Sequence, residues 1–198
     1  MLKWSGKFGA VAALVCLVAA AGAGSGSASV VASCGASSAV FAPWGDTASY
    51  YQVANGGFES AGGWTLAGGA QIVSDNEPFF VAGAGDSQAL LLRQGAKATS
   101  QPLCFGVNTP GIRLFATSPT GAGSVRVSLV VNGLLGTLSV LDGGVVAADG
   151  SWAPSAKLGT TISQLASLTG ATSVQIRLTA TSGSVEVDDV YVDPFKTS

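Results

Sequence analysis

The side chains of this sequence that could do chemistry are carboxylates, aromatic rings and cysteines, because the chain contains no histidine. Without histidine there is no Ser-His-Asp or Cys-His arrangement, no histidine acid or base, and no histidine-based zinc site. The catalytic chemistry that remains is that of a glycosidase with two opposed carboxylates. The pairs available are Glu59 or Glu77 with Asp86 or Asp189. Nothing in the sequence places such a pair across a cleft, so we expect a protein that is not an enzyme.

Aromatic rings offer a different chemistry, the binding of sugars, since a ring face stacks against the apolar C–H face of a pyranose. Three aromatic residues stand in loop-like settings and are the candidate ligand-binding residues: Trp44, Tyr51 and Trp152. For each of them, the alternative is packing in the core or at its edge. The strands themselves offer mainly Ser, Thr, Arg and Gln, which argues against a cleft lined with rings.

These side chains must be positioned by β-strands, because the chain shows no helical periodicity after its first segment. Turn-forming residues are dense, with 28 Gly and 7 Pro, and short β-branched and aromatic runs recur between them. Residues 124–131 alternate polar and apolar before Asn132-Gly133, which predicts a hairpin that returns over 134–141. A further turn is expected at 142–144. Other strands are expected at 64–73, 78–81, 89–92, 112–116 and 172–181.

The apolar alternation breaks once, near the end of the chain. Val185 and Val187 share one parity, whereas Val190 and Val192 share the other. An extra residue at Asp188-Asp189, a β-bulge, would let all four valines point inward. One of the two carboxylates would then point sideways.

Two motifs carry a family resemblance. Asn55-Gly56-Gly57-Phe58-Glu59, followed by Gly63-Trp64-Thr65, resembles the opening strand of galactose-binding-like jelly rolls and of family 4/9-type carbohydrate-binding modules. The closing Val187-Asp188-Asp189-Val190 resembles their last strand. The resemblance implies an all-β fold, an antiparallel β-sandwich (jelly roll), with the first and last strands side by side. Phe41-Ala42-Pro43-Trp44-Gly45-Asp46 and Asn76-Glu77-Pro78-Phe79 also resemble segments of small secreted bacterial proteins of unassigned function.

The same resemblance implies a cofactor. In those modules the opening acidic residue and a closing aspartate commonly hold a structural calcium ion, so Glu59 and Asp189 become the candidate metal ligands. Calcium takes six to eight oxygens, often from more than one carboxylate, and Asp188 and backbone carbonyls could supply others. The alternative is that Glu59 caps a turn and the two aspartates are solvated.

The first 28 residues read as an export signal. Lys3 and Lys7 precede an apolar stretch over 8–23, and small residues follow at 24–28, which suits signal-peptidase cleavage. The alternative, a transmembrane anchor, fits less well because the stretch is short and rich in Ala and Gly. We therefore divide the chain into a signal peptide (1–28), an irregular leader (29–54) and a jelly-roll domain (55–198).

The cysteines point to the same compartment. Cys16 falls within the predicted signal, which leaves Cys34 and Cys104 as an even pair that we expect to form a disulfide tethering the leader. Closing a loop of about 70 residues would contribute about 4 kcal/mol. The alternative is that Val31-Ala32-Ser33-Cys34 is a lipobox and that Cys34 becomes a lipid anchor.

The charge balance bears on partners. The full chain has a net charge of −2, which becomes more negative when Lys3 and Lys7 are removed. With no basic stripe, nucleic acid is not an expected partner. Together with the family resemblance, the sequence predicts a secreted, monomeric binding module with a polysaccharide or glycan as partner. Calcium is the cofactor that the resemblance implies. A structural or protein-interaction protein of the cell surface or matrix is the alternative, and a glycosidase a more distant one.

Overall fold

The computed structural model describes Met1 and residues 35–104, 111–159 and 170–193. Val31–Ser198 form one compact unit. The predicted signal peptide and Cys34 lie outside the described residues, apart from Met1, so the signal, the disulfide and the lipobox stay predictions. The only helix in the described part of the chain is a single 3₁₀ turn, η1 (Ala42–Trp44). None of the described helices is long and apolar enough to cross a membrane.

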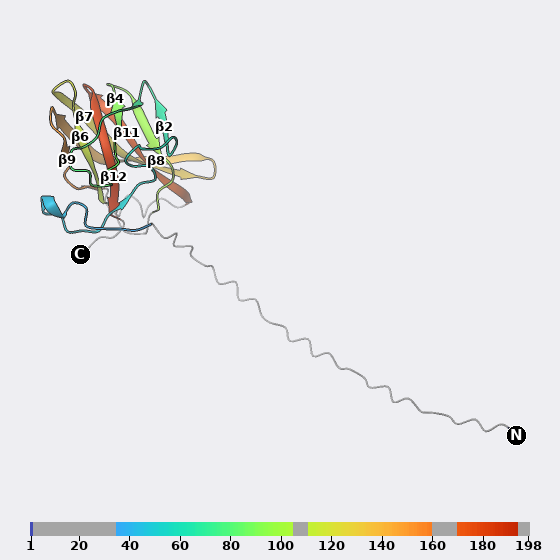
Figure 1. Ribbon diagram of the computed structural model, residues 1–198. Helices are drawn as coiled ribbons and strands as arrows, with labels where there is room; N and C mark the ends of the chain where they lie inside the picture. The colour runs from blue at the N-terminus through green and yellow to red at the C-terminus, as the bar shows by residue number, and fades with distance from the viewer. Residues whose placement is uncertain (2–34, 105–110, 160–169, 194–198) are drawn as a thin grey trace. The chain divides into compact units, whose positions relative to one another are not determined.

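All other described elements are strands, arranged in two antiparallel sheets (Figure 1). The seven-stranded sheet follows the order β10-β6-β12-β4-β3, with β1 paired to β12 and β9 paired to β6. Its strands are β1 (Tyr51–Gln52), β3 (Gln71–Val73), β4 (Ala89–Leu92), β6 (Gly111–Thr117), β9 (Ala153–Pro154), β10 (Leu158–Gly159) and β12 (Val185–Asp193).

The five-stranded sheet follows the order β2-β5-β11-β7-β8. Its strands are β2 (Trp64–Ala67), β5 (Lys97–Ser100), β7 (Ala122–Gly133), β8 (Gly136–Asp149) and β11 (Ala171–Ser182). Along β11 every second residue is buried, namely Val174, Ile176, Leu178 and Ala180, as the alternation in the sequence predicts.

The main core lies between the two sheets. It takes the inward side chains of both, including Phe58 and the four valines of β12. The all-β pattern predicted from turn spacing and alternation, and the β-sandwich that the family resemblance implies, are thereby confirmed.

Several turns differ from the sequence-based expectation. The β7–β8 hairpin turns at Leu134-Leu135, with Gly133 paired to Gly136, and not at Asn132-Gly133. The Asn132 amide explains this shift, because it donates to Gln175 Oε1 (2.8 Å) on the neighbouring β11 and so keeps Asn132 within the sheet. Gly143 is the extra residue of a bulge within β8 and does not form a turn. The expected strand over 64–73 is two strands, one in each sheet.

The leader contributes to the fold more than expected. Its Tyr51–Gln52 forms β1, antiparallel to Val192 and Tyr191 of β12. The motif after it, Asn55–Phe58, is a turn and not a strand, and Asn55 and Phe58 have φ values of 52° and 60°. This turn still lies beside the last strand, because Val190 donates its N–H to the carbonyl of Gly56 (3.0 Å).

Candidate functional site

The predicted bulge in β12 is present and organises a group of acidic side chains. Asp188 pairs with Phe115 of β6, whereas Tyr191 pairs with Arg113, so β12 carries one extra residue between these pairs. Asp189 takes a φ of 50° at this point, which is uncommon for a residue other than glycine. Both aspartates are only 1% exposed. At the bulge, both carboxylates therefore point into the protein and not into the solvent.

A loop that is distant in sequence adds Glu77 and Asp86 to this group. The backbone N–H of Glu77 donates to Asp188 Oδ2 (3.2 Å), and the N–H of Asp189 donates to Asp188 Oδ1 (2.8 Å). The fully buried Glu77 carboxylate accepts from the backbone N–H groups of Phe79 and Val81. We call Glu77, Asp86, Asp188 and Asp189 the acidic cluster.

Three aspartates of the acidic cluster have raised pKa values. Burial, followed by the charge of Asp189, raises the pKa of Asp188 to about 8. Burial, followed by the charges of Glu77 and Asp86, raises the pKa of Asp189 to about 7. The pKa of Asp86 is also raised, by burial and by Glu59. Like charges in a poorly solvated place each disfavour the ionised form of the others.

Two oxygens of the acidic cluster lack a hydrogen bond. Asp189 Oδ1 accepts from the Gln52 amide (2.7 Å), but Asp189 Oδ2 and Asp86 Oδ2 are buried with no hydrogen-bond partner within the described structure. Buried oxygens of this kind carry a free-energy cost unless another group satisfies them. Several carboxylates and nearby carbonyls are the donor set that a hard cation such as calcium prefers. The donor types fit a calcium ion, although no three acidic, histidine or cysteine side chains of the described residues already converge as a metal site.

Glu59, the other predicted calcium ligand, is engaged elsewhere. Its Oε1 accepts from the backbone N–H groups of Ser87 and Gln88, both at 2.7 Å. It thereby fixes the chain immediately after Asp86. In this structure Glu59 positions the loop that carries Asp86. The charge of Glu59 raises the pKa of Asp86, and the charge of Asp86 in turn raises the pKa of Asp189.

A second group of side chains covers the outer face of the seven-stranded sheet. Phe41 and Tyr50 of the leader pack on Phe115 of β6 and Tyr191 of β12, and all four are 5% exposed or less. Phe41 and Phe115 stack with centroids 5.6 Å apart, and Tyr50 meets Phe41 edge-on at 5.0 Å. We call these four residues the outer aromatic cluster.

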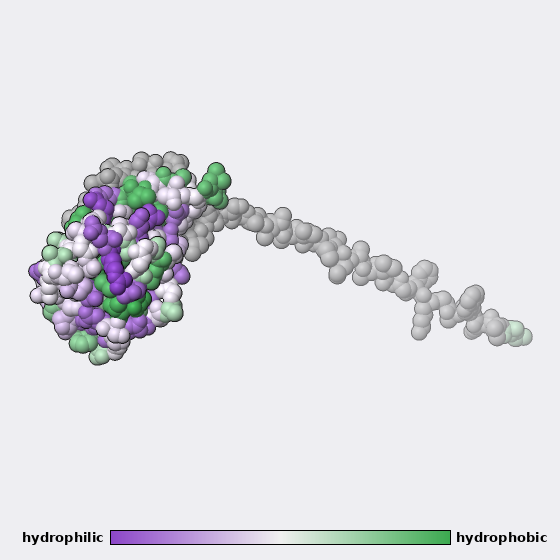
Figure 2. All heavy atoms as spheres, turned by 90° about the horizontal axis from the view of Figure 1, so that it is seen from above, coloured by the Kyte–Doolittle hydropathy of each residue, from purple (hydrophilic) through white to green (hydrophobic). Residues whose placement is uncertain are grey.

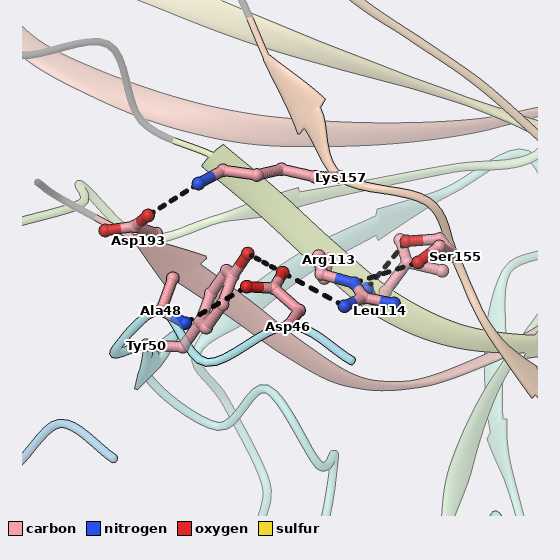
Figure 3. Close-up of polar contacts among 8 residues, drawn as sticks. All are labelled: Asp46, Ala48, Tyr50, Arg113, Leu114, Ser155, Lys157 and Asp193. Carbon is pink, nitrogen blue, oxygen red and sulfur yellow. Dashed lines mark hydrogen bonds and ion pairs between the residues drawn. The ribbon is translucent and has the colours of Figure 1, made fainter. Parts of the chain in front are cut away.

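Charged side chains tie the leader to this face, as Figure 3 shows. Arg113 Nη1 forms an ion pair with Asp46 (3.0 Å), and its guanidinium carbon lies 4.2 Å from the centroid of Phe41. Asp46 also accepts from the Tyr50 hydroxyl (2.7 Å), and Arg113 Nε donates to the Ser155 carbonyl (2.9 Å). Although desolvation opposes it, hydrogen bonding by Tyr50, Ala48 and Arg113 lowers the pKa of Asp46.

The three predicted sugar-binding aromatics have different positions. Tyr51 is 5% exposed and belongs to the main core, with its hydroxyl donating to the Cys104 carbonyl. It also lines a hollow of about 300 Å³ together with Pro102 and Leu103. Trp44 and Trp152 are half-buried, and both pack against the outer aromatic cluster. The structure thus brings Trp44 and Trp152 to one face of the molecule.

Phe79 joins them, although the sequence analysis did not select it. Its ring contacts Trp44 (5.0 Å between centroids, edge-on) and Phe115 (5.6 Å), and it is 44% exposed. Glu77 and Asp86 of the acidic cluster were likewise not assigned together to a metal site. Their loop contacts Asp188 across 111 residues of sequence, and no short motif encodes that contact.

Comparison with known proteins supports the fold. No family model matches the sequence, and neither does any curated protein. Among solved structures, the CBM22-1 xylan-binding domain of Paenibacillus barcinonensis Xyn10C superposes with a TM-score of 0.51 at 13% identity, over 75% of this chain and 94% of that one. The CBM22-2 xylan-binding domain of the same protein gives a TM-score of 0.50 at 14% identity, over 73% of this chain and 97% of that one.

A third solved structure contains a catalytic module as well. The CBM22-1–GH10 modules of Clostridium thermocellum Xyn10B, complexed with xylohexaose, give a TM-score of 0.51 at 16% identity, over 75% of this chain and 29% of that one. At these identities the likeness defines the fold alone. The chain has the jelly-roll β-sandwich fold of carbohydrate-binding modules.

Proposed function

We propose that this protein is an exported, non-catalytic carbohydrate-binding module that binds a polysaccharide through the aromatic face made by Trp44, Phe79 and Trp152. The observation that carries the proposal is the gathering of these three partly exposed rings on one buried aromatic cluster. A ring supported from beneath keeps its orientation and can stack on a pyranose at little entropic cost. Exposed Thr47 stands near Trp44 in the chain and can hydrogen-bond to sugar hydroxyls.

Retention on insoluble polysaccharide tests this proposal, with xylan first because the superposed modules are xylan-binding domains. We expect Trp44→Ala and Trp152→Ala each to weaken binding about threefold to tenfold, the scale of one aromatic contact. Leu135→Ala removes an exposed side chain from the β7–β8 turn and should bind like the parent. If the parent is retained on xylan, cellulose, β-glucan, chitin and peptidoglycan no better than on inert beads, the alternative of a structural or protein-interaction protein replaces the proposal.

We propose further that a structural calcium ion binds at the acidic cluster, with Asp189 and Asp86 as carboxylate ligands. The two unpartnered oxygens and the raised pKa values support this, because a divalent cation would satisfy the oxygens and offset the clustered negative charge. The ion would link the last strand to the loop after Asp75. Its role would be structural.

Melting temperatures with calcium and with chelator test the metal site. The parent should melt at a higher temperature with calcium, and this difference should disappear in Asp189→Asn and Asp86→Asn. Glu59→Gln should lower the melting temperature in both conditions yet keep a calcium response, because Glu59 holds the loop through Ser87 and Gln88. Equal melting of the parent with calcium and with chelator would remove the metal from the proposal without affecting sugar binding.

Export is the remaining part of the proposal, and the intact mass of the secreted protein tests it. Cleavage after Ala28 gives a chain starting at Ser29, and a disulfide between Cys34 and Cys104 lowers its mass by two hydrogens. A chain starting at a lipidated Cys34 would support the lipid-anchor alternative instead.

A further inference from the structure

A hollow at one lateral edge of the sandwich lies outside the acidic cluster and the outer aromatic cluster. It lies between the second half of β8 (Val145–Asp149) and the segment that carries β9 and β10 (Ser151–Leu158), with Ala116 of β6 also lining it. At this edge β8 ends the five-stranded sheet, and β9 and β10 border the other sheet. Its volume is about 220 Å³. We call it the edge hollow.

The lining combines a small apolar floor with polar groups. Ala116, Val146 and Ala148 are 9% exposed or less and present only short side chains. Asp149, Ser151 and Ser155 add a carboxylate and two hydroxyls. A sugar ring has the complementary surface, with C–H groups on its faces and hydroxyls around its edge, whereas a purely apolar ligand would leave these polar groups unpaired.

Size and charge narrow the ligand class. The edge hollow is smaller than the clefts of roughly 300–1,000 Å³ that hold drug-sized ligands, so it has room for about one ring. None of the residues that line it is basic. Asp149 uses Oδ1 to accept from the backbone N–H of Ser151 (2.9 Å) and carries a negative charge at the exposed rim. An anionic sugar would meet repulsion there without a compensating cation.

The edge hollow also adjoins the proposed aromatic face. Ser151 and Ala153 line the hollow, while Trp152 between them packs against the outer aromatic cluster. One short segment therefore separates the two places. We propose that the edge hollow is a second carbohydrate site that takes one neutral or amino-sugar ring and excludes uronic acids. The inference rests on the proposed function in that both sites take carbohydrate.

Amide chemical-shift mapping by NMR tests the inference on the mature protein, with methyl β-xyloside, methyl β-glucoside, glucosamine and glucuronic acid as probes. We expect shifts at the amides of 145–149, 153 and 155 with the neutral or amino sugars and none with glucuronic acid. Ala156→Phe places a large side chain at an exposed position of the lining and should abolish these shifts. Ala67→Phe, a matched change on exposed β2 at the opposite edge of the five-stranded sheet, should leave them unchanged.

A second variant tests the charge argument. Asp149→Asn keeps an acceptor for the Ser151 N–H but removes the charge, so glucuronic acid should then bind about as well as the neutral sugars. Glucuronic acid bound by the parent as tightly as glucoside would overturn the inference.

The outcomes separate the two proposals. Shifts that appear only around Trp44 and Trp152, or that survive Ala156→Phe, would overturn the second site while the aromatic face stands. Shifts at the edge hollow, together with polysaccharide retention that is unchanged in Trp44→Ala and Trp152→Ala, would overturn the proposed binding at the aromatic face. The second site would then stand alone.

Discussion

The guanidinium of Arg113 lies over the ring of Phe41, and the carboxylate of Asp46 compensates its charge. The Arg113 side chain is 8% exposed and that of Asp46 is 23% exposed. Removing one partner of such a pair leaves a charge without compensation in a poorly solvated place, which is far more costly than losing an exposed pair. The Arg113–Asp46 ion pair therefore stabilises the packing of the leader on the seven-stranded sheet.

The contribution of this ion pair to stability can be predicted and compared with that of an exposed pair in the same protein. Arg113→Met should lower the free energy of unfolding by about 2–4 kcal/mol, measured by urea denaturation. Arg126→Met removes the same charge from the exposed pair with Asp142, whose side chains are 44% and 60% exposed, and should change it by less than about 1 kcal/mol. Equal effects of the two changes would show that burial of the Arg113 pair has no energetic consequence.

At the scale of elements, the turn after β1 packs closely against the bulge of β12, so the opening and closing motifs lie side by side as the resemblance implies. Gly56 approaches β12 so closely that a Cβ there would lie 2.6 Å from the carbonyl oxygen of Val190. Gly57 beside it would bring a Cβ to 3.1 Å from Asp189 Oδ1. Glycine at these positions lets the turn close over the acidic cluster.

Gly56→Ala should therefore push the turn off β12 and lower the free energy of unfolding by roughly 2 kcal/mol or more, as overpacking against a fixed backbone does. The calcium response of the melting temperature should weaken as well. Gly85→Ala is the matched control, because a Cβ at Gly85 has no atom within 4 Å; its effect should stay within about 0.5 kcal/mol.

The same junction shows how far the sequence predicts the structure. The switch in valine parity predicted the bulge correctly, because burying Val185, Val187, Val190 and Val192 in one core leaves a single solution. The Asn132-Gly133 turn was predicted wrongly, since the local hairpin preference lost to cross-strand hydrogen bonds of Asn132. A turn preference read from neighbouring residues takes no account of Gln175, which lies 43 residues further along the chain.

The site residues likewise divide into those that a local sequence pattern reveals and those that only a distant contact brings together. The double aspartate could be recognised because its own strand pattern breaks there. Glu77 and Asp86 could not be grouped with it, because a loop without periodic pattern brings them to β12. Tyr51 was selected as a ligand-binding ring because the leader looked irregular, whereas its pairing with Val192 buries most of that ring in the core.

At the scale of the whole molecule, the leader adds a third layer to the sandwich. Phe41 is fully buried between the leader and the seven-stranded sheet. On the surface drawn in Figure 2, by contrast, apolar residues form separate patches between polar ones. Losing the leader's contacts would expose Phe115 and Tyr191 and remove the support of the proposed sugar-binding rings.

Phe41→Ala should consequently lower the free energy of unfolding by about 3–5 kcal/mol, as truncation of a buried phenylalanine does, and it should weaken polysaccharide retention. Phe80→Ala truncates a ring that is 49% exposed and should have a small effect on both. Unfolding by urea and retention on the same polysaccharide are the two measurements. A stable Phe41→Ala protein would mean that the leader does not contribute to the folding unit.

Three carboxyl groups with raised pKa values make the stability of the whole molecule depend on pH. Asp188 and Asp189 have pKa values raised to about 8 and about 7, and burial with Asp75 nearby raises the pKa of Glu186 to about 7. The folded protein then holds protons that the unfolded chain releases near pH 4. By linkage, their contribution is fully present below about pH 4 and is lost as pH rises through 7 to 8.

In chelator, the melting temperature should therefore fall between about pH 5 and pH 8. Asp46 and Asp142 have lowered pKa values and act oppositely, since their stabilisation is lost only when pH falls below the normal aspartate range. Calcium should flatten the fall, because a bound cation favours the ionised carboxylates. Asp189→Asn should flatten it without calcium, whereas Asp149→Asn at the exposed rim of the edge hollow should not. A melting temperature that rises from pH 5 to pH 8 in chelator would show that the carboxylates of the cluster ionise freely in the folded protein.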